Sequence, residues 1–594
     1  MKKIKHVCLV LTVLLAFSAC TKDILDKKPL DVITDLDVWK SAPLVRTYIN
    51  GIYNNMDFTY VDQSNINTVP WQMTEALYMD DTSGPGFGGV PKFGTLNAES
   101  SWLNWWGYKS IRQMNYGLEK LPTATIEEGI KKSSMAEIRF LRAFSYFHMV
   151  KLFGGVPLIT KVLGVNDPME ELFIPRAKEV DVYNFIISEL DAIAADLPET
   201  VPASELGRPT KAAGLALKAR AALYAGSIAQ YGALQLDGVV GIPAGQATSF
   251  YQKSYDASKA IMTVSAATGK PALYNSNPDA VKNFNEIFLK SNNAEVIMAK
   301  NFWSAAGFGG TGPANIWNLC ESPGFNHPWG AGNANNCYLE FVNDFENADG
   351  TPGQLVIDEN KWTTTQNLWG KKEPRFFASV YTENTPYESQ DGTTFTPTTV
   401  RMYSKVLTLD GATLTSGTYQ NINVAPTGQG KAFGCLKYCK GNQWPQAVDW
   451  ILFRYAEVLL NNAEAAFELG KTGEALAAVN QIRARVHLPA LASITRELIR
   501  HERRVELCFE SHRYWDLRRW RTAEQKLNGS IYHTLELTLD YASFAADPKN
   551  AKYRFKVIPA DGGQVMVFAP KNYYLPIGPS RIANNAKLVE NPGY

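Results

Sequence analysis

Residues 454–486, RYAEVLLNNAEAAFELG-KTG-EALAAVNQIRARV, decide the fold class of this chain. The stretches on both sides of Lys471-Thr472-Gly473 lack proline and are rich in helix formers, which predicts two helices joined by a tight turn. Small side chains stand where the two antiparallel helices would approach, at Ala463, Ala466, Ala475 and Ala478. The unit has 33 residues, close to the tetratricopeptide period of about 34. We therefore expect a helix pair of that kind.

Four more segments with helical patterns precede this unit. Residues 136–153 (AEIRFLRAFSYFHMVKLF) are apolar around most of a helical circumference and stop at Gly154-Gly155. The others are residues 178–196, the alanine-rich residues 211–231, and residues 250–262 as partner of the alanine-rich helix. Because one helix pair leaves an apolar face uncovered, we expect the pairs to stack into a single, mainly α, tetratricopeptide-like scaffold.

Long irregular segments separate the helices and hold most of the tryptophan. Residues 54–106 and 301–369 are rich in Gly, Asn and Pro and contain nine of the fourteen tryptophans. Loops of this length are usually functional or disordered, and the aromatic content argues against disorder. Residues 381–429 are Thr-rich and predict short strands or loops. The tryptophan-rich segments are therefore expected to carry function.

The N-terminus has the parts of an export signal. Lys2, Lys3 and Lys5 precede a mostly apolar run at residues 7–19, which is too short to span a bilayer. The sequence FSAC at residues 17–20 resembles a bacterial lipobox, with Phe17 where Leu is usual. We predict a lipoprotein signal peptide at 1–19, a tether at 20–36 lipidated on Cys20, and one domain at 37–594, held to a membrane by the lipid alone. The alternative is an ordinary signal peptide followed by a chance cysteine.

Composition excludes several functional classes. The chain has 594 residues, with 59 Lys+Arg against 58 Asp+Glu and a formal charge of +1. This balance argues against a strongly basic nucleic-acid-binding protein and against a highly charged disordered chain. Beyond Cys8 and Cys20, five cysteines remain. An odd, scattered set does not make a disulfide framework, so free or singly paired thiols are expected.

Catalytic and cofactor motifs fail when their context is considered. Two G-x-G-x-x-G matches, at residues 84–89 and 307–312, have prolines close by and lack the strand and helix that a dinucleotide site needs. The sequence HERR at 501–504 is followed by Val505 where a zincin has its second His, and Cys435-x3-Cys439 has no second ligand pair. The sequence DFENADG at 344–350 places Phe345 where a calcium loop needs a carboxylate. We expect no enzyme activity, no cofactor and no metal site.

A series of sequence blocks, in order along nearly the whole chain, resembles the SusD/RagB family of outer-membrane nutrient-uptake lipoproteins from Bacteroidetes. The blocks are residues 20–29, 137–147, 153–158, 207–211, 219–224, 345–350, 373–375, 454–460, 502–510, 513–517 with Trp520, and the ending 574–577 and 591–594. Each block alone is a weak signal of the family, whereas all of them in this order are a specific one. Two positions depart from the family pattern: Phe17 in the lipobox, and Ser511, where the family usually has Gly.

The resemblance implies a fold, a partner and a function. The fold would be tetratricopeptide-like helix pairs on one side and a loop-rich ligand face on the other. The partner would be a SusC-like TonB-dependent barrel, on which the lipoprotein sits as a lid that captures oligosaccharide at the cell surface for import. Two alternatives remain open: capture of peptide, as in the RagB branch, and a secreted glycosidase.

The charged residues within the family-like blocks have a structural explanation. Charges on strongly apolar helices must be paired or reach solvent. We therefore expect ion networks without catalytic purpose at Arg139, Arg142, Arg503, Arg504, Glu506 and Glu510. His148 lies within a predicted buried helix, and we expect a hydrogen-bonded core histidine there.

The candidate ligand residues lie on the long loops. Sugar rings stack on Trp and Tyr, while sugar hydroxyls need polar partners, and a lid needs its contacts on loops facing the barrel. We predict aromatic platforms at Trp71, Trp102, Trp303, Trp317 and Trp329, with Asp80 and Asp81 as polar partners. Each tryptophan has an alternative role as an anchor that fixes its loop to the scaffold. Among the neighbouring residues Trp105 and Trp106, we expect at least one in the core.

Overall fold

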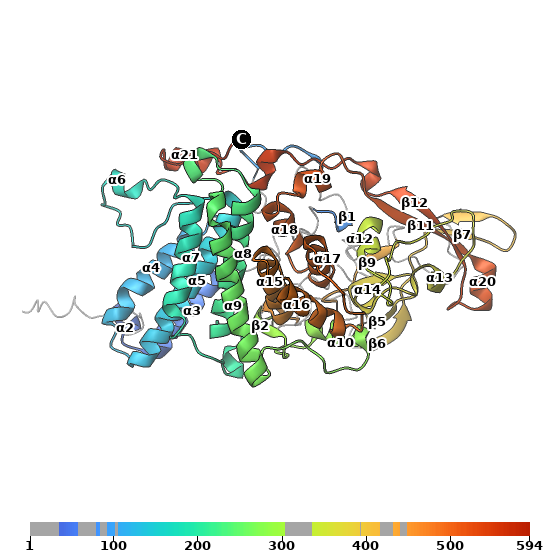
Figure 1. The fold of residues 1–594 in the computed structure, drawn as a ribbon, viewed down its shortest axis with the longest axis horizontal. Coiled ribbons are helices and arrows are strands. Elements are labelled where there is room, and N and C mark those ends of the chain that lie inside the picture. Colours follow the sequence, from blue (N-terminus) through green and yellow to red (C-terminus); the bar gives the residue numbers. More distant parts are fainter. Residues whose placement is uncertain are drawn as a thin grey trace, which may run out of the picture.

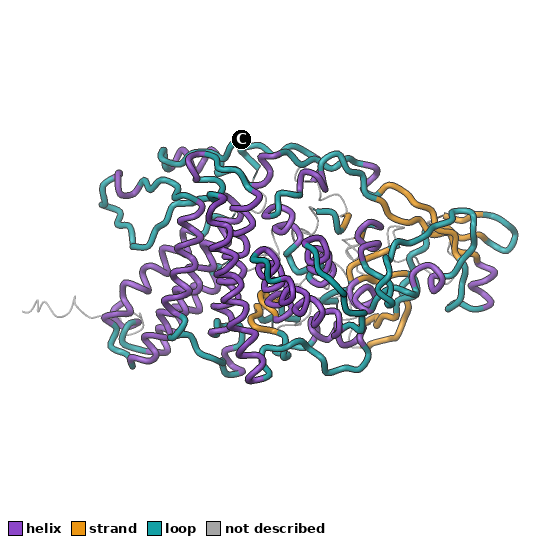
Figure 2. Tube along the Cα trace, in the orientation of Figure 1, coloured by secondary structure: helices purple, strands orange, loops and turns teal. Residues whose placement is uncertain are grey.

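The computed structural model describes residues 35–56, 79–83, 92–100, 105–302, 336–391, 394–415, 432–439 and 448–594. In the view of Figures 1 and 2, helices fill the left and centre of the molecule, and strands gather toward the right. The N-terminal helices α2 (Asp35–Val38) and α3 (Ala42–Asn54) lie at one end. The strand-rich end contains α20 (Tyr541–Ala546).

The helical scaffold is a continuous stack in which each helix packs on the next. Its order is α4 (Tyr108–Lys120), α5 (Glu128–Phe153), α7 (Glu179–Ile193), α8 (Lys211–Tyr231), α9 (Ala247–Thr268), α15 (Tyr455–Glu468) and α16 (Thr472–Arg485). The contact of α9 with α15 bridges some 190 residues of intervening chain, since α9 ends at Thr268 and α15 begins at Tyr455. This arrangement confirms the predicted tetratricopeptide-like stacking.

Local signals explain where the scaffold helices begin and end. Helix α8 has the predicted bounds, with the Thr210 hydroxyl accepting a hydrogen bond from Ala213 N at 3.3 Å. Helix α5 begins earlier than predicted because the Glu127 carboxylate caps it, accepting from Gly129 N at 2.8 Å and Ile130 N at 3.3 Å. It ends at Gly154, whose φ of 76° suits glycine.

The turn within the deciding helix pair differs from the prediction. The turn was expected at Lys471-Thr472-Gly473, whereas α15 ends at Glu468 and α16 already begins at Thr472. Gly470 adopts a φ of 76°, the left-handed conformation that commonly terminates a helix. The chain therefore reverses two residues earlier, and Gly473 lies inside α16.

Two further helices complete the centre of the molecule. Helix α17 (Arg496–Glu506) packs on α15, and α18 (Arg513–Arg519) contacts α8. Shorter helices are α6 (Met169–Leu172), α10 (Ala280–Leu289), α12 (Leu339–Asp344), α13 (Thr365–Trp369), α14 (Pro374–Ser379), α19 (Ala523–Leu527) and α21 (Pro579–Asn584). Helices α12 and α13 lie in a segment predicted to be irregular throughout, so its C-terminal part is more regular than expected.

Within the part of the chain that the structure describes, the strands form four small sheets. One has the order β1 (Thr82–Ser83), β3 (Asn336–Cys337), β9 (Phe433–Cys435) and β4 (Val380–Thr382). A second has the order β12 (Tyr553–Pro559), β11 (His533–Asp540), β7 (Lys405–Leu407) and β8 (Thr413–Thr415). Two pairs complete the set: β10 (Trp450–Arg454) with β2 (Val296–Lys300), and β5 (Pro386–Asp391) with β6 (Thr394–Thr399). The short strands predicted within residues 381–429 are confirmed for the described part.

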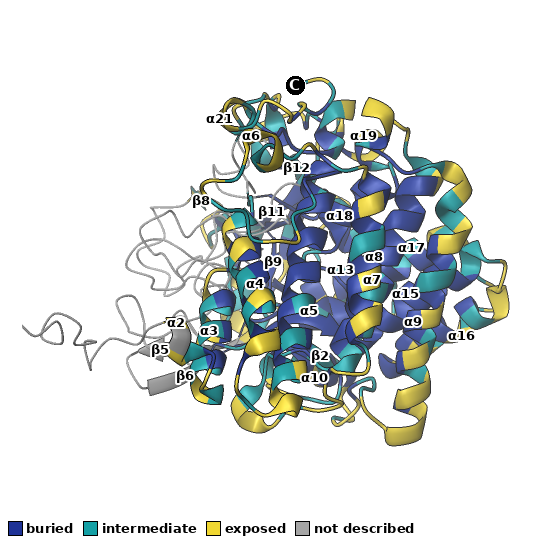
Figure 3. Cartoon of the chain, turned by 90° about the vertical axis from the view of Figure 1, so that its left-hand side faces the viewer, coloured by how far each residue is buried: buried dark blue, intermediate teal, exposed yellow. Residues whose placement is uncertain are grey.

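The core runs through both the helical and the strand-rich parts (Figure 3). Helices α5, α8 and α15 are buried over most of their surface, as their apolar sequences require. Among the described residues, no helix combines the length and apolarity needed to cross a membrane. Cysteines 337, 435, 439 and 508 are buried.

Candidate ligand-binding site

A four-stranded sheet gathers the ends of the predicted ligand loops. In this loop-base sheet, made of β1, β3, β9 and β4, Thr82 pairs with Cys337, Asn336 pairs with Gly434, and Tyr381 also pairs with Gly434. Strand β1 lies between residues 57–78 and 84–91, β3 directly follows residues 303–335, and β9 directly follows residues 416–431. Described strands that adjoin segments far apart in the sequence therefore pair in one small sheet.

The five predicted tryptophan platforms, Trp71, Trp102, Trp303, Trp317 and Trp329, lie outside the described residues. Their roles stay predictions, but the structure places the chain on either side of them. Trp71 precedes β1, and the segment that carries Trp303, Trp317 and Trp329 ends at β3. At the start of that segment, Phe302 N donates a hydrogen bond to Asp449 Oδ1 at 3.2 Å. Asp449 in turn follows residues 440–447, so two loop ends are joined there.

Asp80 and Asp81 directly precede β1 of the loop-base sheet, and each is 1% exposed. Arg513 holds Asp80 with two parallel hydrogen bonds, Nε to Oδ1 at 2.9 Å and Nη2 to Oδ2 at 2.6 Å. Arg504 reaches Asp80 Oδ2 and Asp81 Oδ1 at 3.1 Å each, and Asp344 Oδ2 at 2.7 Å. We call these five residues the loop-base cluster. Asp80 and Asp81 thus bind β1 to α17 and α18, and their predicted role as ligand contacts stays a prediction.

The two aspartates of the loop-base cluster have different electrostatics. Burial alone would raise the pKa of Asp80, but Arg504 and Arg513 outweigh it and hold the pKa below its ordinary value. For Asp81, burial together with Asp80 and Asp344 raises the pKa to about 6 against the opposing arginines. The Oδ2 atom of Asp81 is buried without a hydrogen-bond partner in the described part of the chain. Asp80 is therefore firmly paired and Asp81 only partly so.

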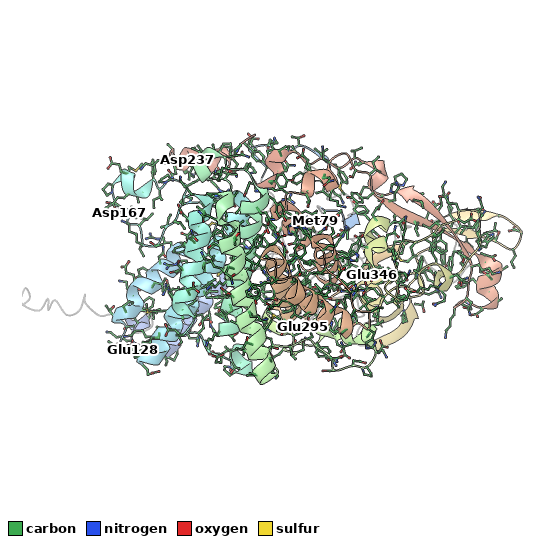
Figure 4. All side chains as sticks on the ribbon, in the orientation of Figure 1. Met79, Glu128, Asp167, Asp237, Glu295 and Glu346 are labelled. Atoms are coloured by element: carbon green, nitrogen blue, oxygen red, sulfur yellow. The ribbon has the colours of Figure 1, made fainter. Side chains whose placement is uncertain are left out.

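A second set of contacts holds β1 and the residue before it. Lys92 Nζ donates to Thr82 O at 2.7 Å and lies 4.7 Å from the centre of the Tyr338 ring. Tyr338 N donates to Asp81 O at 2.9 Å, and its hydroxyl donates to Asp561. Met79, directly before these residues, is buried and labelled in Figure 4. The base of the loops is thus fixed by ion pairs, a cation–π contact and backbone hydrogen bonds.

Described tryptophans near the loops act as anchors. Trp369 is 4% exposed and packs edge-on against Phe433 and Phe555. Trp106 packs against Phe153 and carries Arg581 on its face, while Trp105 packs against His148. These contacts confirm that Trp105 and Trp106 pack against the core.

The family-like charges are paired, as expected. Arg139 and Arg142 both bond Glu189, at 2.8 Å and 2.6 Å, and Arg503 bonds Asp516 at 2.7 Å. Glu506 accepts from Arg375, Arg454 and Arg485, which also share Glu295 and Glu502. We call these residues around Glu506 the ion lattice; Glu295 is labelled in Figure 4. Burial raises the pKa of Glu506, but the surrounding cations outweigh it and hold the pKa well below its ordinary value.

His148 is buried on α5, as predicted, and burial holds its pKa well below the ordinary value. Cys508 is buried beside the ion lattice, and burial raises the pKa of its thiol to about 11. Neither group has the ionised form that nucleophilic or acid chemistry at neutral pH requires. Among the described residues, no cluster of three His, Cys, Asp or Glu is placed to hold a metal ion.

Comparison with known proteins gives the family. A model described as the SusD family matches residues 294–594. The chain belongs to the SusD family. A second model, described as starch-binding associating with outer membrane, matches residues 89–223. The resemblance stated from the sequence blocks is thereby confirmed.

Individual SusD-family relatives match either almost the whole chain or a shorter part of it. A SusD-like protein of Formosa agariphila is 24% identical over 582 residues, 92% of this chain and 99% of the relative. The starch-binding protein SusD of Bacteroides thetaiotaomicron is 39% identical over 121 residues, 20% of either chain. A crystal structure of a SusD-like protein from Bacteroides fragilis matches with a TM-score of 0.71 at 25% identity, covering 96% of this chain and all of that one. A laminarin-binding SusD-like protein shares the fold, with a TM-score of 0.57 at 22% identity.

Proposed function

We propose that this protein is a cell-surface glycan-binding lipoprotein that captures oligosaccharide and delivers it to a SusC-like TonB-dependent transporter of the outer membrane. It acts by binding rather than by catalysis, and it needs no cofactor. The single domain at residues 37–594 would hang from the membrane by a lipid on Cys20.

One observation supports the binding proposal: β1, which follows Trp71 in the sequence, pairs with β3, which follows Trp303, Trp317 and Trp329. A rigid base allows aromatic side chains from distant parts of the sequence to work together on one ligand. Relatives described as binding starch and laminarin support a glycan as that ligand. The buried ion pairs of the loop-base cluster supply the rigidity of this base.

A binding panel tests the proposal directly. The full-length chain is titrated with neutral and acidic oligosaccharides and with short peptides, and turnover of labelled oligosaccharide is followed in parallel. We expect binding of at least one glycan, no product, and no peptide binding. Binding of peptides alone would replace the proposal by peptide capture, and product formation would replace it by hydrolysis.

Alanine variants of the five loop tryptophans locate the glycan contacts. A true platform loses glycan affinity at an unchanged melting temperature. Trp369→Ala is the matched control: it removes a core tryptophan, should cost about 3–5 kcal/mol of stability, and should leave affinity of the folded fraction unchanged. If all five loop variants behave like Trp369→Ala, the platforms lie elsewhere.

The anchor is tested separately. Cys20→Ala should release the protein from membranes, because a lipid on Cys20 is the only proposed attachment. Cys8→Ala is the control, since Cys8 lies within the predicted signal peptide and would be removed with it. Unchanged membrane association of Cys20→Ala would contradict the lipid anchor.

A further inference from the structure

A small hollow of about 20 Å³ lies between helices α5, α7, α8 and α18 and the C-terminal segment at residues 573–574. Its volume exceeds the roughly 10–15 Å³ that one water molecule needs, and it leaves no room for a sugar. Four cationic side chains line it, together with several aromatic rings: Lys151, Arg518, Arg519 and Arg521. None of the loop-base cluster residues lines this hollow.

Two of the four cations reach a carboxylate. Arg519 Nη2 donates to Glu464 Oε2 at 2.7 Å. Arg521 Nη2 donates to the Tyr574 hydroxyl at 2.8 Å, and that hydroxyl donates to Glu179 Oε2 at 2.8 Å. Arg519 is therefore paired directly, and Arg521 is linked to its carboxylate through one hydroxyl.

Arg518 has no carboxylate partner within the described chain, although it is only 6% exposed. Its guanidinium carbon lies 3.3 Å from the centre of the Tyr514 ring and 5.0 Å from that of Phe568. Such contacts supply no acceptor in the plane of the guanidinium, where only Nη1 has a described acceptor, Tyr514 O at 3.2 Å. Because a buried charge is costly unless it is paired, an anion beside the remaining N–H groups would stabilise the fold.

The pKa values of the surrounding groups reflect this excess of positive charge. Burial would lower the pKa of Arg519, but its carboxylate partners, above all Glu464, outweigh it and raise the pKa. For Arg518, burial lowers the pKa, Arg521 adds to this effect, and the nearby tyrosines oppose it only in part. Burial raises the pKa of Glu179 to about 7, so this carboxylate is only partly ionised at neutral pH.

We propose that the hollow is an anion site that binds a single halide ion such as chloride, held by Arg518 with Lys151 and Arg521 beside it. A halide ion is little larger than a water molecule, and hydrogen bonds from arginine to an anion are among the strong ones in proteins. Lys151, Arg521 and Tyr573 are half-buried, whereas the other lining residues are buried, so the ion enters from their side. The bound ion joins α18 to α5 and to the C-terminal segment.

Thermal melts of the full-length chain test the site. Sodium gluconate is replaced stepwise by sodium chloride or sodium bromide at constant ionic strength, and gluconate is too large for the hollow. Because an ion that binds only the folded chain stabilises it, the melting temperature should rise with halide concentration and then saturate. The absence of a saturable rise in the wild type overturns the proposal.

Three variants assign the halide effect to the hollow. Arg518→Gln should raise the half-saturating halide concentration by at least about tenfold, the loss expected for a hydrogen bond to a charged group. Lys151→Met keeps an apolar side chain at the Trp515 ring, 4.3 Å from the present ammonium, and should also weaken the halide effect. Arg554→Gln is the matched control, because Arg554 lies over the Trp362 ring at 4.6 Å and does not line the hollow.

The control should respond to halide like the wild type. If Arg518→Gln does not fold, Lys151→Met and the position of bromide in crystals decide the question. Crystals of the wild type soaked in bromide should show an anomalous peak in the hollow. A water molecule alone there, a bromide peak without any halide effect on the melting temperature, or an equal halide effect in Lys151→Met and the wild type overturns the proposal. None of these measurements uses a glycan, so their outcome is independent of the proposed function.

Discussion

The ion lattice and the loop-base cluster both bury carboxylates against arginines, on different sides of helix α17, yet they are saturated to different degrees. In the ion lattice, Arg485 alone bonds both oxygens of Glu506, at 2.6 and 2.7 Å, and Arg375 and Arg454 add further contacts. In the loop-base cluster, Asp81 accepts from Arg504 at 3.1 Å, and its other oxygen has no hydrogen-bond partner among the described residues. The carboxylate of Glu506 is therefore fully paired, while the carboxylate of Asp81 retains unused hydrogen-bonding capacity within the described chain.

This difference gives the two carboxylates opposite pH dependences. Since the pKa of Glu506 lies below its unfolded value of about 4.3, its contribution to stability is present above that pH and is lost on acidification. The pKa of Asp81 is raised to about 6, so its contribution is fully present below about pH 4 and is lost as pH rises through 6. As the pH falls, protonation of Asp81 near pH 6 therefore stabilises the loop-base cluster first. The ion lattice loses the contribution of Glu506 only at lower pH.

The largest effect is expected at the lattice. Glu506→Gln should lower the free energy of unfolding by about 5 kcal/mol, the upper end for a broken buried ion pair, because three arginines lose their shared partner. Chemical denaturation of the full chain measures this loss. A loss below 1 kcal/mol would mean that the lattice arginines find other partners.

A smaller loss is expected at Asp80. Asp80→Asn should cost about 3 kcal/mol, the lower end of the same range, because Arg504 keeps Asp81 and Asp344. Hydrogen exchange at residues 79–83 should accelerate more than exchange in α15. Uniform acceleration across the chain would show that the cluster is not a local anchor.

The adjacent residue should respond in the opposite sense. Asp81→Asn removes a carboxylate whose ionisation is unfavourable, so the free energy of unfolding at pH 8 should rise by about 1–3 kcal/mol, with no gain near pH 4. Denaturation midpoints of the variant and of the wild type at the two pH values measure the difference. A loss of stability at pH 8 as large as that of Asp80→Asn would contradict the contrast between the two aspartates.

The smallest effect concerns the turn between α17 and α18. Ser511 adopts a φ of 61°, which costs a non-glycine residue roughly 1–2 kcal/mol, and glycine recovers part of this against its greater flexibility when unfolded. Ser511→Gly should therefore stabilise the protein by about 0.5 kcal/mol. Ser511→Ala keeps the strained conformation and should give no gain in a thermal melt. Equal melting temperatures for both variants would mean that the turn is unstrained.

The sequence predicted the scaffold better than the base of the loops. Helix α8 was placed to the residue, because alanine content and a threonine cap are local signals. The Lys471–Gly473 turn was misplaced because both Gly470 and Gly473 suit a helix end, and only the backbone conformation of Gly470 decides between them. Local patterns thus define helices to within a turn.

The loop base could not be predicted, because its contacts are long-range. Asp81 and Arg504 are 423 positions apart, and Asp80 and Arg513 are 433 apart. Sequence reasoning singled out both aspartates and Arg504 but paired none of them, and it missed Lys92 and Tyr338 altogether. Neither has a local motif that would mark it: a lysine directly after a proline and a tyrosine after a cysteine are ordinary until the fold brings them to β1.

If the loop-base cluster positions the glycan-binding loops, breaking the cluster should weaken binding of an identified glycan ligand. Asp80→Asn is compared with Glu189→Gln, which breaks a buried pair with Arg139 and Arg142 in the distant α5–α7 contact at a similar cost in stability. At a temperature where both variants are folded, we predict at least tenfold weaker glycan binding for Asp80→Asn and wild-type affinity for Glu189→Gln. Equal glycan affinities of the two variants, whether strong or weak, would contradict a positioning role for the loop-base cluster.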